Sequence, residues 1–209
     1  MKATVLFIDD DEIERRSSTD VLKEIFADEP ITIQALSPLP TLADYAKLLN
    51  EIAPSAIIVD QRLNTSSGIP YSGADLAAHL RTIGSRVPIV ILTNYPDDDF
   101  TAQGWAVECI IQKKTTLRDP SAAPAIDFKR RLCRHIEVCA IILAAREHRF
   151  HELLVKSSHE SLTPVEESEL RQLEGERIAS VVAAEREKQV QLDAEIAKLK
   201  ELLGRDRLL

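Results

Sequence analysis

The chain has 209 residues, of which 44% are hydrophobic but only 4% aromatic, and its formal net charge is −8. This length is compatible with one large domain, or with one domain and an extension. The excess acid lies entirely in residues 1–128, which hold 11 Lys and Arg against 19 Asp and Glu, whereas residues 129–209 hold 15 of each. Neither part carries clustered positive charge, so the composition argues against nucleic-acid binding.

Three further features concern the compartment of the protein. Cys109, Cys133 and Cys139 show no CxxC spacing, and we expect each to be a small buried side chain. The sequence contains no apolar leader and no run of 18 apolar residues. We therefore expect a reduced, cytoplasmic protein without membrane contact.

The first part of the chain alternates apolar runs with amphipathic segments. Strands are predicted at Val5–Ile8, Ile31–Leu36, Ala56–Asp60, Val87–Leu92 and Cys109–Gln112. Helices are predicted at Glu12–Phe26, from an N-cap at Thr41 to Pro54, and at Gly73–Ile83. Strands that alternate with helices predict an α/β fold with a doubly wound, five-stranded parallel sheet.

After Ile126 the strand signals stop and helical periodicity takes over. An apolar face that we expect to close the sheet comprises Phe128, Leu132, Ile136, Cys139, Ile142 and Leu143. A heptad seam then follows a strict 4-3-4-3 spacing through Ile178, Val182, Glu185, Gln189, Leu192, Ile196, Leu199 and Leu203. We predict a coiled coil with a second copy or another protein. The alternative is an amphipathic helix packed on its own domain.

Polar side chains follow four of the predicted strands at the point where each strand ends. Because the carboxyl ends of parallel strands meet at one edge of a sheet, these side chains are expected to converge. They are Asp9-Asp10-Asp11, Asp60, Thr93 and Lys113.

In this order, the residues resemble the receiver domain of two-component response regulators, over residues 1–146. The resemblance implies a flavodoxin-like receiver, and the heptad seam predicts a helical coiled-coil extension over the remaining residues 147–209. It also implies that Asp60 is the phosphoacceptor, Thr93 the switch hydroxyl and Lys113 the contact to a phosphoryl oxygen. By family analogy the cofactor is Mg2+, and its ligands are Asp9, Asp10, Asp60 and the backbone carbonyl of Arg62.

The resemblance further implies how such a chain works. A sensor histidine kinase or phosphotransfer protein would be the partner, and the chain itself would not be an enzyme. Phosphorylation would switch dimerisation or another protein–protein interaction through the helical C-terminus, without a DNA-binding output. The alternatives are a constitutive scaffold with a degenerate receiver, and a phosphorelay intermediate that also uses His159.

The sequence departs from the family pattern at three positions. Lys113 is followed by Lys114, where the family commonly has proline, so the usual cis-proline turn is expected to be missing. Asn94 replaces the small residue after the switch Thr, and Ile110 replaces the aromatic residue of the fifth strand. These departures concern the output mechanism more than the phosphorylation chemistry.

His159 lies in the segment Ser158-His159-Glu160-Ser161-Leu162-Thr163-Pro164, which is similar to the phosphoacceptor histidine box of sensor kinases. A simpler interpretation explains most of the same residues. Thr163 as N-cap, Pro164 at the first helical position and Glu166 two residues later form a capping box that starts a helix. No glycine-rich ATP-binding segment follows, so a complete kinase is excluded.

Overall fold

The computed structural model describes residues 2–65, 68–95, 98, 104–175 and 177. The elements alternate along the first part of the chain as the sequence predicts. In chain order they are β1 (Ala3–Ile8), α1 (Glu12–Ile25), β2 (Ile31–Leu36), α2 (Asp44–Ile52), β3 (Ala56–Val59), α3 (Gly73–Thr82), β4 (Ile89–Thr93), the 3-10 helix η1 (Gly104–Ala106), β5 (Cys109–Gln112), α4 (Lys113–Thr116) and α5 (Ala123–His159).

The five strands form one parallel sheet in the order β2-β1-β3-β4-β5, which confirms the predicted flavodoxin-like fold. Ile8 on β1 is level with Val59 on β3, and Val59 is level with Ile91 on β4. This register brings the residues that follow β1 and β3, and the last residue of β4, to one edge of the sheet.

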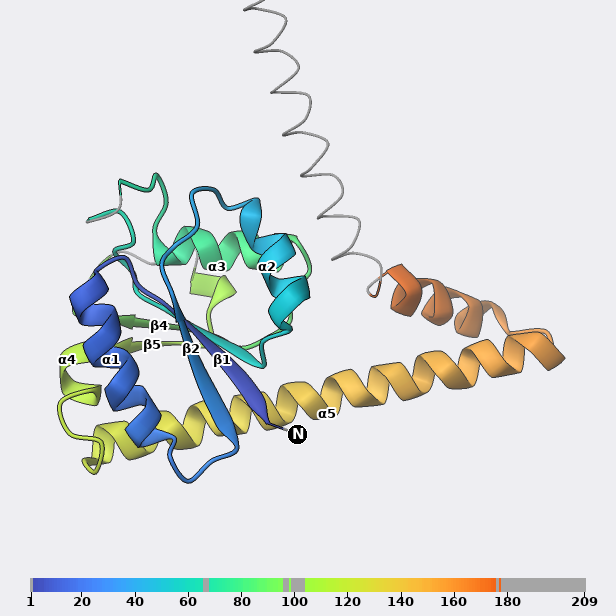
Figure 1. Ribbon diagram of the computed structural model, residues 1–209. Helices are drawn as coiled ribbons and strands as arrows, with labels where there is room; N and C mark the ends of the chain where they lie inside the picture. The colour runs from blue at the N-terminus through green and yellow to red at the C-terminus, as the bar shows by residue number, and fades with distance from the viewer. Residues whose placement is uncertain (1, 66–67, 96–97, 99–103, 176, 178–209) are drawn as a thin grey trace, which may run out of the picture.

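Helices cover both faces of the sheet (Figure 1). On one face, Phe26 at the end of α1 and Phe128 of α5 pack in one core cluster with Phe7 of β1. On the other face α2 and α3 pack on Leu6, Ile57 and Ile91. The central strand β3 is buried at all four positions, as expected for a strand covered on both sides.

One local prediction needs correction. Thr41 is not the N-cap of α2: its hydroxyl donates to Asp44 Oδ2 (2.8 Å) within a turn, and the helix begins at Asp44 after Ala43. At the end of β5 the chain runs directly into the short helix α4, which begins at Lys113. No described peptide bond is cis, in agreement with the expected loss of the cis-proline turn after Lys113.

Helix α5 is 37 residues long and extends well past the sheet (Figure 1). Phe128 and Leu132 are buried against the sheet as predicted, but Ile142 and Leu143 are 45% and 44% exposed. The predicted apolar face therefore closes the sheet only through its first part, because the helix outruns the strands. The predicted domain boundary at residue 146 lies inside this continuous helix.

After α5 the chain turns and forms a second helical stretch over residues 164–175, which folds back along α5 (Figure 1). Arg149 donates to both carboxylate oxygens of Glu169 (3.0 and 2.8 Å), and Lys156 donates to Glu166 (2.7 Å). The predicted seam from Ile178 to Leu203 lies outside the described residues. Within the described part, no helix is long and apolar enough to span a lipid bilayer.

Candidate functional site

The carboxyl edge of the sheet holds four of the predicted site residues. Asp9 follows β1, Asp60 follows β3, Thr93 ends β4 and Lys113 follows β5. All four side chains are buried: their residues are 1%, 9%, 1% and 5% exposed. A parallel sheet places the ends of its strands side by side, so four residues far apart in sequence share one small volume.

Lys113 links the two acidic residues of this group. Its Nζ donates to Asp9 Oδ2 (2.5 Å) and to Asp60 Oδ1 (3.3 Å). It also donates to Glu14 Oε2 (2.8 Å) on α1. Lys114, the next residue, is exposed and takes no part in this group.

The electrostatics of the group show a shortage of positive charge. Burial raises the pKa of Asp9 and of Asp60 above its usual value, against the opposing effect of Lys113. Burial alone would lower the pKa of Lys113, but the negative charges of Asp60, Asp9 and Glu14 outweigh it and raise that pKa. One ammonium faces three carboxylates, so the site favours an additional positive charge.

The loop after β3 holds Asp60 in place. Asp60 Oδ2 accepts a hydrogen bond from the backbone N–H of Arg62 (2.7 Å). Gly73, the first residue of α3, donates its N–H to the carbonyl of Gln61 (2.9 Å). The Gln61 side chain in turn accepts from the N–H of Ala74 (3.1 Å), which ties the start of α3 to the end of β3.

The remaining acidic residues of the first loop have different surroundings. Asp11 is the N-cap of α1 and accepts from the N–H groups of Ile13 and Glu14 (2.8 and 2.9 Å). Asp10 is half-buried beside it. Among the described residues no three acidic, His or Cys side chains converge as a ready ligand set, and the predicted metal ligands stay a prediction.

A polar cover lies over the loop that carries Asp60. The Arg62 guanidinium stacks on the ring of Tyr95, 3.3 Å from its centroid, and forms two hydrogen bonds with Asp98 (3.2 and 3.0 Å). The Thr93 hydroxyl accepts from the N–H of Tyr95 (3.0 Å). Asn94 Oδ1 is buried without a hydrogen-bond partner.

Sequence reasoning missed two residues that shape this site. The sequence pattern places Glu14 only within an amphipathic helix, although its position in the first turn of a helix that starts just after β1 is a signal that it lies near the strand ends. Gly73 was expected only as the start of a helix, and no sequence pattern shows the close backbone approach that it permits.

His159 lies apart from this group, exposed in the last turn of α5. The capping box predicted just after it is present. Thr163 donates its N–H to Glu166 Oε2 (2.9 Å), and its Oγ1 accepts from the N–H of Glu166 (3.3 Å). The helix start thus accounts for the Thr-Pro-x-Glu part of the segment without a role for His159.

No protein-family model matches the sequence, and no curated protein matches it. Similar solved structures include the response regulator TrrA from Thermotoga maritima in complex with Mg2+-BeF, with a TM-score of 0.46 and 17% identity over 63% of this chain and 97% of TrrA. The response regulator RcsB from Salmonella typhimurium has a TM-score of 0.44 and 13% identity, over 88% of this chain and 93% of RcsB. The anti-anti-sigma factor PhyR from Bartonella quintana has a TM-score of 0.41 and 15% identity, over 71% of this chain and 51% of PhyR.

The architecture itself gives the fold. The strand order and the side chains at the carboxyl edge agree with the order of residues that carried the resemblance in the sequence. By this strand order and arrangement, the first part of the chain has the fold of a response regulator receiver domain.

Proposed function

We propose that this chain is a response regulator of a two-component phosphorelay and that Asp60 is its phosphoacceptor. The observation that carries the proposal is the position of Lys113 Nζ, which lies between Asp9 and Asp60 at the carboxyl edge of the parallel sheet. The donor would be a partner histidine kinase or phosphotransfer protein.

The reaction is an in-line phosphoryl transfer. An oxygen of the Asp60 carboxylate forms the new bond to phosphorus as the bond to the donor's leaving atom breaks, and the leaving group keeps that electron pair. Lys113 provides a fixed positive charge for the oxygens of the transferred group. The N–H of Arg62, which contacts Asp60 Oδ2, orients the carboxylate.

The residues suit a divalent cation of the magnesium type. Carboxylate and carbonyl oxygens are the ligands that this hard cation prefers, and the site is short of positive charge. Asp9, Asp10, Asp60 and the backbone carbonyl of Arg62 would hold it. When bound, the ion would offset the repulsion between these carboxylates and an incoming phosphoryl group.

Thr93 is suited to report the state of Asp60. Its side chain is buried at the end of the strand next to β3, and a hydroxyl that accepts one hydrogen bond can donate another to a phosphoryl oxygen. Its movement would change the segment between β4 and β5 and, through α4, the start of α5. The helical C-terminus would then change its pairing with a second copy or another protein.

The test is incubation of the full chain with acetyl phosphate, with and without Mg2+, followed by intact mass and light scattering. We expect a gain of one phosphoryl group that requires Mg2+ and is absent in Asp60→Ala. Asp28→Ala, which removes an exposed carboxylate far from the site, is the matched control and should be phosphorylated normally.

The possible outcomes separate the proposal from its alternatives. If neither acetyl phosphate nor any histidine kinase tested adds a phosphoryl group, the proposal is wrong and the alternative of a constitutive scaffold with a degenerate receiver is favoured. Phosphate that remains in Asp60→Ala and is lost in His159→Ala would instead favour the relay. A phosphoryl gain without a change in light scattering would remove dimerisation as the output.

A further inference from the structure

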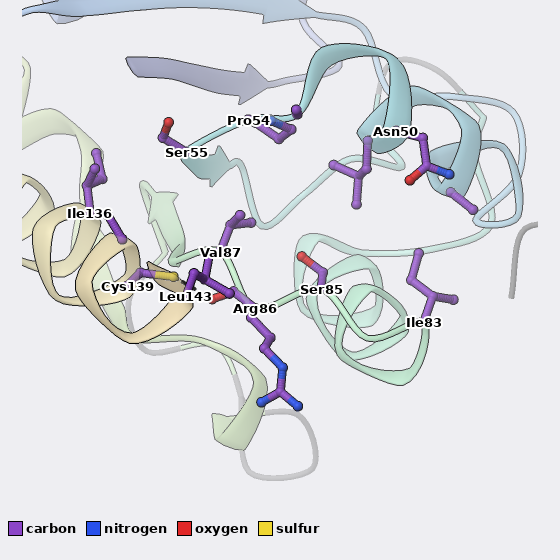
Figure 2. Close-up of a pocket in the computed structure, with 14 residues that line it drawn as sticks. Asn50, Pro54, Ser55, Ile83, Ser85, Arg86, Val87, Ile136, Cys139 and Leu143 are labelled. Atoms are coloured by element: carbon purple, nitrogen blue, oxygen red, sulfur yellow. Dashed lines mark hydrogen bonds between the residues drawn. The ribbon is translucent and has the colours of Figure 1, made fainter. Parts of the chain in front are cut away.

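An apolar groove lies at the opposite edge of the sheet from the site. It is a pocket of about 400 Å³ between α5, the turn from α2 to β3 and the turn from α3 to β4 (Figure 2). The aliphatic side chains of its wall include Ala46, Leu49, Ile83, Val87, Ile136 and Leu143. The thiol of Cys139 also lines it and donates to the carbonyl of Arg86 (3.2 Å).

The groove continues along α5 into a second pocket of about 240 Å³. The two pockets share Arg86, Val87 and Leu143 in their walls. Leu173 and Arg177, from the segment that folds back along α5, line the second pocket. Arg177, the last described residue, therefore lies beside a continuous groove.

The part of α5 along this groove is apolar on every side. Residues 138–145 have the sequence VCAIILAA, without a charged side chain. Ile141, Ile142 and Leu143 are 65%, 45% and 44% exposed. A helix that is apolar all round is normally covered by other elements, so the described residues leave part of this stretch uncovered.

The existing helical hairpin fixes the direction in which a partner would arrive. Glu166 pairs with Lys156 (2.7 Å) and Glu169 with Arg149 (2.8 Å), so the second stretch runs antiparallel to α5. Arg177 continues this contact, with Glu147 at 3.3 Å and the Phe150 ring at 4.2 Å. In this register the next residues would face residues 138–145.

The sequence of those next residues matches the surface that they would meet. Residues 178–184 read IASVVAA and are also uncharged. At helical spacing, Ile178 and Val182 share one face with Glu185. An antiparallel course would bring Glu185 toward Arg131 and Arg134, which precede the apolar stretch of α5.

We propose that residues 178–184 continue the hairpin and occupy this groove, with Ile178 and Val182 against Cys139 and Leu143. The proposal divides the heptad seam at Glu185 and Gln189. The first two seam residues dock on their own chain, and the seam from Leu192 to Leu203 is left for a second copy or another protein.

The test uses Cys139 as a reporter inside the groove. In a full chain carrying Cys109→Ala and Cys133→Ala, Cys139 is the remaining thiol, and its rate of labelling by iodoacetamide measures access to the groove. We expect Val182→Asp to raise this rate about tenfold, which corresponds to about 1.4 kcal/mol of docking free energy. Ile196→Asp, in the second part of the seam, is the matched control and should leave the rate unchanged.

A second measurement does not depend on a destabilising variant. In the same background, Val182→Cys should form an intramolecular disulfide with Cys139 on oxidation of dilute protein, because such a bond needs the two Cα atoms about 4.4–6.8 Å apart. Ser180→Cys, on the other side of the helix, should not. Disulfide-linked dimers would assign the groove to a second copy, and equal cross-linking of the two variants would also overturn the proposal.

Discussion

Gly73 lies against the backbone carbonyl of Asp60. A β-carbon added to Gly73 would lie 2.3 Å from that oxygen, far inside van der Waals contact. Because Gly73 has no side chain, the start of α3 can approach the backbone of Asp60, the proposed phosphoacceptor, this closely. The position of Asp60 depends on this close approach between two backbones.

Gly73→Ala should therefore destabilise the fold and displace Asp60. Because the blocking atom is backbone, the strand end or the helix must shift, and overpacking of this kind costs about 1–3 kcal/mol. The free energy of unfolding in urea measures the loss, and the initial rate of phosphorylation by acetyl phosphate should fall with it. Gly175→Ala is the matched control: a β-carbon there meets no atom within 4 Å, so unchanged or slightly higher stability is expected.

Lys113→Met should be strongly destabilising at neutral pH. It leaves the buried carboxylates of Asp9 and Asp60 without their shared cation, and removing one partner of a buried ion pair costs about 3–5 kcal/mol. The free energy of unfolding in urea is the measurement. Adding Asp9→Asn to Lys113→Met should recover part of the loss, whereas a further additive loss would mean that the two residues do not interact.

The same variant should show a pH dependence of known sign. Burial raises the pKa of Asp9 and Asp60 above the value of 3.8 that each has when unfolded, so the folded state binds more protons than the unfolded state above that pH. The free energy of unfolding should then fall as the pH rises above about 4, and more steeply in Lys113→Met than in the wild type. Urea titrations between pH 5 and pH 8 would detect the difference, and identical slopes would contradict it.

The sequence predicts features of this fold that depend on local pattern. The apolar runs that precede Asp9, Asp60 and Lys113 predict strands, and the parallel sheet brings these three side chains together. Features that depend on distant partners are harder to predict. Thr41 is of a residue type that often caps helices, but its hydroxyl donates a hydrogen bond to Asp44 instead. Leu143 belongs to the predicted apolar face, but it is partly exposed because α5 extends past the sheet.

Magnesium should stabilise the folded chain through the acidic residues at the carboxyl edge. At a Mg2+ concentration ten times its dissociation constant, binding to the folded state alone adds about 1.4 kcal/mol. For a domain of this size, that raises the unfolding midpoint by about 3–6 °C, and EDTA should reverse the shift. Thermal unfolding followed by circular dichroism is the measurement.

Two neighbouring carboxylates provide the control for this shift. Asp10→Asn should abolish the Mg2+ effect, since Asp10 is one of the proposed metal ligands. Asp11→Asn should keep it, because the Asp11 side chain caps α1. If both variants keep the shift, the ion binds elsewhere.

Acid should loosen the helical hairpin beyond the sheet. Hydrogen bonds from Lys156 and Thr163 lower the pKa of Glu166 to about 2 from its ordinary value of 4.5. A carboxylate with a lowered pKa stabilises the folded state above its unfolded pKa, and that contribution is lost as the pH falls toward 2. Hydrogen exchange of the amides at residues 166–169 should therefore become faster relative to the rest of the chain between pH 5 and pH 2. Glu166→Gln should already show weakened protection at pH 5 and little further change, whereas an equal pH response in both proteins would show that Glu166 does not hold the hairpin.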